Sequence, residues 1–104
     1  MGSEQTTETF SFTVVQHLVF IDGDAYLPET LTVTSGSTVT WVNVKGAEDF
    51  DSFLHDVTFT GGSKVSSPPL PLYSYWSFTF TTQGSYDYTD SIYSFMHGSV
   101  TVTG

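Results

Sequence analysis

The chain has 104 residues, with eleven acidic side chains, two lysines, no arginine and a formal net charge of −9. This balance argues against nucleic acids and anionic membrane surfaces as partners, because both require a cationic face. The absence of cysteine excludes disulfides, thiolate nucleophiles and thiolate metal sites, and no apolar run approaches the roughly eighteen residues of a membrane span.

Aromatic residues reach 16% of the chain, and threonine, serine and valine fill much of the remainder, which is typical of β-strands. We expect residues 1–8 to be a tag or flexible N-terminus, because they are polar and aperiodic. Residues 9–104 are then one all-β domain, a sandwich of seven or eight strands in two sheets.

The first strands show alternation of apolar and polar residues. Phe10, Phe12 and Val14 share one parity, and the pattern resumes at Leu18 and Phe20. We therefore expect these residues to face the core, with His17 on the opposite, wetter face. A turn is predicted at residues 22–24, a short strand at 31–33 and a second turn at 35–37.

The later strands are more regular. A strand over 38–44 places Val39 and Trp41 on one face, and residues 55–59 have apolar odd positions. The clearest alternation covers 76–80, where three aromatic residues are separated by serine and threonine. Strands at 86–88 and around 100–102 complete the predicted sandwich.

Strand parity also orients the ionisable residues. His55 is predicted to point into the sandwich, and His97 is predicted to point outward. Asp90 continues the inward parity of Tyr86 and Tyr88. A carboxylate there is costly unless it is hydrogen-bonded, paired with a cation or protonated, although Asp90 could instead turn outward and cap the loop.

Two parts of the sequence resemble a known family. The segment Tyr86 to Val100, YDYTDSIYSFMHGSV, resembles the copper-binding loop of amicyanin/plastocyanin-like cupredoxins, the blue copper proteins. That loop has the pattern Tyr-Asp-Tyr-x-Cys-x-x-His-Pro-x-Met-x-Gly. Residues 39–43 (VTWVN) and 55–59 (HDVTF) resemble the segments VTWxN and HxVxF of the same family. The resemblance implies a cupredoxin-like Greek-key β-sandwich over most of the chain.

The resemblance also implies positions for the copper ligands. His55 stands at the first histidine and Met96 at the axial methionine, whereas Asp90 replaces the cysteine and Tyr93 replaces the second histidine. Type 1 copper uses two imidazoles and one thiolate with a weak axial ligand. We therefore expect no blue copper and no conventional electron transfer.

Three hypotheses remain open. His55, Asp90, Tyr93 and Met96 could form a harder site for copper(II) or zinc(II), with Asp56 adding negative charge nearby. Alternatively, the pocket is vestigial and the domain is a metal-free binding or structural module. The chain could also be an engineered, ligand-swapped variant of a copper electron-transfer protein. No nucleophile–base constellation is apparent, so we do not expect an enzyme.

Two further expectations concern the partner and the location of the domain. An aromatic patch near Tyr73, Tyr93 and Phe95 could contact a protein partner. The family resemblance implies an extracytoplasmic location, whether secreted, periplasmic or at the cell surface, with a leader that is not part of this chain.

Overall fold

The structure, a computed structural model, describes residues 17–45, 54–60 and 65–104, except for the side chain of Lys45. The predicted N-terminal segment 1–8 and the predicted strand around Phe10 to Val14 lie outside the described residues. A helix of the length and apolarity needed to cross a membrane is not found in the part of the chain that is described.

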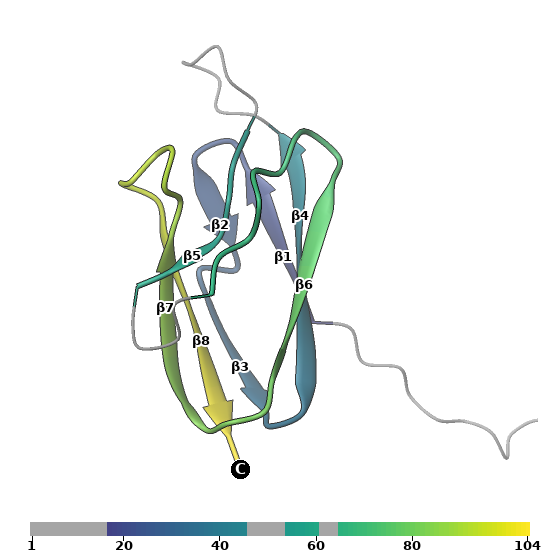
Figure 1. The fold of residues 1–104 in the computed structure, drawn as a ribbon, viewed down its shortest axis with the longest axis vertical. Coiled ribbons are helices and arrows are strands. Elements are labelled where there is room, and N and C mark those ends of the chain that lie inside the picture. The colour runs from purple at the N-terminus through teal and green to yellow at the C-terminus, as the bar shows by residue number, and fades with distance from the viewer. Residues whose placement is uncertain (1–16, 46–53, 61–64) are drawn as a thin grey trace, which may run out of the picture.

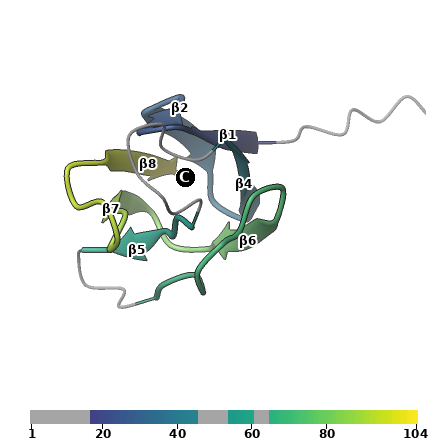
Figure 2. The same cartoon turned by 90° about the horizontal axis from the view of Figure 1, so that it is seen from above.

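The described chain folds into two packed sheets, each with four strands (Figures 1 and 2). The first sheet has the order β2-β1-β4-β6 and the second has the order β3-β8-β7-β5. The strands are β1 (His17–Asp22), β2 (Ala25–Leu27), β3 (Thr30–Thr34), β4 (Ser37–Lys45), β5 (Thr58–Phe59), β6 (Tyr75–Phe80), β7 (Gly84–Thr89) and β8 (His97–Thr103). This arrangement confirms the predicted all-β sandwich. The short strand β2 was not predicted.

Each sheet contains one parallel pair of strands that are distant in sequence. β1 pairs with β4, and β3 pairs with β8. The other pairs of named strands are antiparallel. Chain crossovers between the two sheets therefore close the sandwich, and in the second sheet β7 lies between β8 and β5. We refer to the end drawn uppermost in Figure 1, where the loop between β7 and β8 lies, as the upper end.

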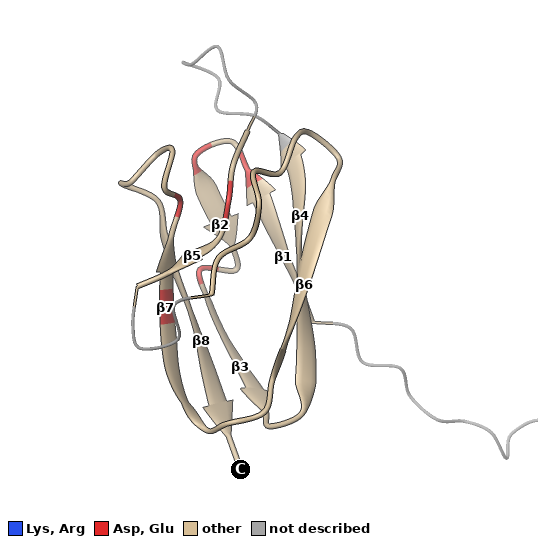
Figure 3. Ribbon diagram, in the orientation of Figure 1, with Lys and Arg blue, Asp and Glu red and all other residues tan. Residues whose placement is uncertain are grey.

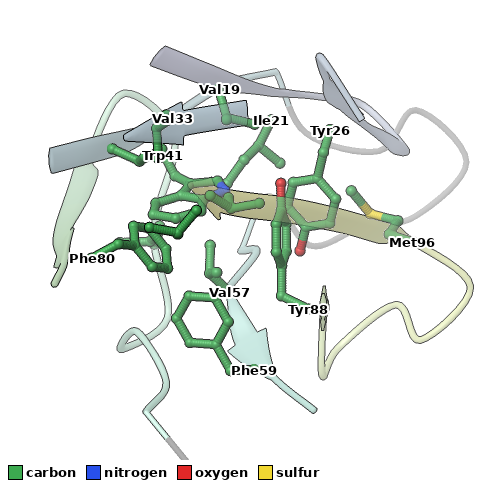
Figure 4. Close-up of a cluster of buried hydrophobic side chains, with 14 of the residues drawn as sticks. Val19, Ile21, Tyr26, Val33, Trp41, Val57, Phe59, Phe80, Tyr88 and Met96 are labelled. Atoms are coloured by element: carbon green, nitrogen blue, oxygen red, sulfur yellow. The ribbon is translucent and has the colours of Figure 1, made fainter. Parts of the chain in front are cut away.

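An aromatic cluster fills the space between the sheets (Figure 4). Trp41 is fully buried on β4, and its ring meets those of Tyr88 and Phe59 edge-on at centroid distances of 5.4 and 6.2 Å. Phe80 on β6 is also buried, as the alternation over 76–80 predicts. Burial of these large rings is the main source of stability for a domain of this size.

The prediction for β1 was wrong. Val19 and Ile21 are fully buried, whereas Phe20 lies on the outer face of the sheet and His17 is half-buried. Both parities of this strand are apolar, so alternation alone could not choose the inner face. Pairing with β4 decides it, because Val19 lies opposite the buried Trp41 in the parallel ladder.

Candidate metal centre

The position of His55 is set by backbone pairing at the upper end of the sandwich. His55 and Leu70 form an isolated antiparallel bridge, with N–H to carbonyl distances of 3.2 and 2.7 Å. The side-chain amide of buried Asn43 also donates to the Leu70 carbonyl, at 2.8 Å. Strand β4 and the segment before β6 therefore hold the backbone from which the imidazole projects inward.

His55 and Asp90 form a direct buried contact. His55 Nδ1 lies 2.6 Å from Asp90 Oδ2, and both side chains are fully buried. The other carboxylate oxygen, Oδ1, accepts from the backbone N–H groups of Ile92 at 2.8 Å and Tyr93 at 3.2 Å. The inward orientation predicted for His55 is confirmed, and of the two alternatives left open for Asp90 the structure shows the buried one. The two backbone donors offset the cost of burying the carboxylate.

A second carboxylate joins the same two segments. Asp56 Oδ1 accepts from Ser91 N at 2.8 Å and from the Thr58 hydroxyl at 3.1 Å, while Asp56 Oδ2 accepts from the Ser91 hydroxyl. Consecutive residues 55 and 56 thus bind consecutive residues 90 and 91, just beyond the end of the antiparallel pair of β5 and β7. We call these paired contacts, His55–Asp90 and Asp56–Ser91, the polar clamp.

Sequence reasoning treated Asp56 only as a nearby negative charge and missed Ser91. No local pattern could have indicated their contact, because the partners are 35 residues apart. The sequence offered one hint. Asp56 directly follows an inward-facing histidine and Ser91 directly follows an inward-facing aspartate, so a contact between the first pair would bring the second pair close together.

Tyr93 and Met96 are buried beside the clamp. The ring of Tyr93 lies 5.2 Å from the His55 imidazole, with an interplanar angle of 53°. Met96 closes the loop through its backbone, donating to Tyr93 O at 3.0 Å and accepting from Asp90 N at 3.3 Å. Its side chain lies beside Tyr26 at one end of the core cluster (Figure 4). All four predicted site residues therefore gather at the upper end.

Tyr26 lies within the same polar region. Its hydroxyl donates to the Asp56 carbonyl at 2.6 Å. Burial raises the pKa of Tyr26 far above its usual value, and the nearby carboxylates of Asp90 and Asp56 raise it further. Tyr26 is therefore a neutral hydrogen-bond donor at neutral pH.

The spacing of the His55–Asp90 pair matches a hydrogen bond. Two ligand atoms on one tetrahedral zinc ion, each at about 2.0–2.1 Å, lie about 3.3 Å apart, which is well beyond the observed 2.6 Å. His55 Nε2 is buried and has no hydrogen-bond partner within the described part of the chain. Among the described residues, no three histidine, cysteine, aspartate or glutamate side chains gather in a group that could hold a metal.

Known proteins share both the sequence and the fold of this chain. Amicyanin from Paracoccus denitrificans is 33% identical over 81 residues, a match that covers 74% of this chain and 57% of that protein. A reduced Cu(I) form of an amicyanin variant superposes with a TM-score of 0.74 at 30% identity, covering 89% of this chain and 87% of the other. The chain belongs to the amicyanin-like cupredoxins. A Cu(I) form of another amicyanin variant gives the same TM-score, identity and coverage. No family model matches the chain.

The donor set of this cupredoxin does not fit a type 1 copper centre. Such a centre needs a thiolate and two imidazoles, and the sequence contains no cysteine. The imidazole of His97 lies on the exposed outer face of β8, as predicted, away from the buried pocket. At the four positions that correspond to the family's ligands, the chain therefore offers one imidazole, one carboxylate, one phenol ring and one thioether.

Proposed function

We propose that this cupredoxin does not use type 1 copper and serves as a non-enzymatic binding or structural domain outside the cytoplasm. The observation that carries the proposal is the 2.6 Å contact between His55 Nδ1 and Asp90 Oδ2, in which both side chains are fully buried. In this interpretation the pocket no longer binds a metal, and the polar clamp connects the two segments that form the pocket.

The hydrogen bonds support this structural role. The polar clamp links the segment at residues 55–56 to the loop at 90–96, the same two segments to which the family pattern assigns copper ligands. With Asp90 ionised, the imidazole donates through Nδ1–H. Every carboxylate oxygen in the clamp then has at least one donor. Directional links of this kind stabilise one loop conformation over its alternatives.

A second candidate function is non-blue binding of copper(II) or zinc(II) by His55, Asp90, Tyr93 and Met96. The observation that favours it is the proximity of the Tyr93 ring to the imidazole that already contacts Asp90. Imidazole and carboxylate donors suit both ions. Binding would require Asp90 to move away from Nδ1, because the present separation leaves room only for a proton. Both candidates apply equally to a natural chain and to a ligand-swapped variant.

Titration with copper(II) and zinc(II) tests the two candidates. We expect native mass spectrometry to detect no stoichiometric metal on the chain and the melting temperature to remain unchanged. A metal that bound only the folded state would raise the melting temperature as its concentration increased. A rise that His55→Ala and Asp90→Ala both abolish, and that His97→Ala leaves intact, would contradict the vestigial pocket and support the second candidate.

Restoring the family ligands tests the assignment of positions. The double variant Asp90→Cys/Tyr93→His supplies the missing thiolate and second imidazole next to His55. We expect it to bind copper and to absorb strongly near about 600 nm through the copper–thiolate bond, whereas Asp90→Ser/Tyr93→His should remain colourless. A folded Asp90→Cys/Tyr93→His variant that stays colourless with copper would show that these positions are not equivalent to the ligand positions of the family.

The proposed partner contact at the upper end is only partly accessible. Tyr73 and Phe95 are exposed, whereas Tyr93 is buried against His55. The loop that precedes β6 and the loop between β7 and β8 lie on different sides of the upper end (Figure 2). Exposed Tyr73 and Phe95 therefore offer two small aromatic contacts at this end.

A further inference from the structure

The outer face of the first sheet carries a row of apolar side chains that crosses all four strands. Phe20 on β1 lies opposite Leu27 on β2 and opposite Val42 on β4, and Val42 lies opposite Tyr75 on β6. Their sequence neighbours Val19, Tyr26, Trp41 and Trp76 have the opposite parity and point inward. We call Leu27, Phe20, Val42 and Tyr75 the outer row.

The outer row is accessible over most of its length. Leu27, Phe20 and Tyr75 are 47%, 42% and 69% exposed, and Val42 between them is half-buried. Large apolar side chains that are scattered over a surface need no explanation, but a contiguous exposed row is a typical feature of an interaction site. The row is contiguous because strand pairing places these four residues, which lie between positions 20 and 75 of the sequence, next to one another.

The lower half of the same face has ordinary solvent-facing chemistry. There the hydroxyl groups of Thr38 and Thr79 lie 2.6 Å apart, and those of Thr40 and Ser77 lie 2.7 Å apart. Antiparallel strands with one wetted face normally carry such polar residues along their whole length. On β4 and β6, the lower half of this face therefore carries paired hydroxyl groups, whereas the upper half carries apolar side chains that are unusual for a solvent-facing surface.

Negative charge borders the outer row. Asp22 follows Phe20 on the same face of β1, and exposed Asp24 lies in the turn between β1 and β2. Acidic residues gather near the upper end (Figure 3). The sequence has no arginine and only two lysines, one of which, Lys45, ends β4 opposite Asp22 in the β1–β4 register. With a net charge of −9, a second copy of this chain would bring its own acidic border against this one. Such like-charge contact disfavours self-association.

We propose that the outer row is the docking surface for a protein partner whose apolar contact residues are bordered by lysine or arginine. Tyr75 and Phe20 supply the aromatic contact area that commonly dominates interface energetics. Asp22 and Asp24 orient the partner through complementary charge. The surface is separate from the pocket at His55 and Asp90, so its role does not depend on the metal status of the pocket.

Two short capped peptides serve as probes, one of alternating lysine and leucine and one of alternating glutamate and leucine. We expect the lysine peptide to perturb NMR signals at the outer row and to bind more weakly as salt increases. Phe20→Thr and Tyr75→Thr should each weaken binding by about tenfold. Asp22→Asn should reduce the salt dependence. Ser77→Thr, on the polar half of the same face, should leave the affinity unchanged.

Several results would overturn the proposal. One is equal binding of the glutamate peptide, and another is a perturbation centred on other strands or insensitive to Phe20→Thr. A concentration-dependent dimer in sedimentation experiments, lost in Phe20→Thr, would assign the outer row to a second copy instead.

Discussion

At the centre of the sandwich, buried Trp41 is surrounded by aromatic rings. At the upper end, His55 and Asp90 are equally buried, but they contact each other, and Asp90 also accepts from backbone N–H groups. Contacts in the aromatic centre are non-directional, and their stabilisation grows with the apolar area removed from water. Contacts in the polar clamp depend on direction and on the presence of both partners. Two regions with the same burial should therefore respond differently to substitution.

Trp41→Ala should produce the largest effect, a loss of about 4 kcal/mol in the free energy of unfolding, because it removes the ring at the middle of the cluster. Equilibrium urea denaturation measures this loss. Trp41→Phe keeps part of the ring volume and should lose less. A similar loss for both variants would mean that a specific contact of the indole, rather than its buried area, stabilises the centre.

Asp90→Ala should cost about 3 kcal/mol, because it leaves the buried imidazole of His55 and two backbone N–H groups without their acceptor. His55→Ala should also destabilise the protein, but the double variant should lose less than the sum of the two. A double-mutant cycle by urea denaturation measures this coupling. Additive losses would contradict the clamp, and exposed Asp87→Ala on β7 should change stability by less than about 0.5 kcal/mol.

Tyr88 provides a smaller, pH-dependent effect at the boundary of the two regions. Burial raises the pKa of Tyr88 to about 12, above its usual value of about 10. Between these values the unfolded state loses the phenolic proton and the folded state keeps it. Unfolding then releases a proton, so stability falls as pH rises, by up to about 1.4 kcal/mol per pH unit.

Urea denaturation between about pH 9 and pH 12 measures this slope. Tyr88→Phe removes the titrating group and should flatten the curve, although the similarly buried Tyr26 should keep part of the decline. A Tyr88→Phe variant with the full slope of the parent protein would show that other groups cause the alkaline loss.

Sequence alternation predicted the buried face where threonine and serine alternate with apolar residues. This holds in β6 and in the first half of β4, where Phe80 and Trp41 are buried as expected. The inward orientations of His55 and Asp90 follow from the same parity argument. In β1 both parities are apolar, so the argument selected the wrong face and placed Phe20 in the core.

By itself, the sequence determined the two-sheet class, the strands with clean alternation, and the absence of the thiolate that a blue copper centre needs. Local periodicity is sufficient for these features, because side chains of a strand alternate with a period of two residues. The tertiary structure alone decided that Ser91 binds Asp56 and that residues from four strands form the outer row. Such contacts depend on the register between strands distant along the chain, and register is set by the packing of the whole sandwich.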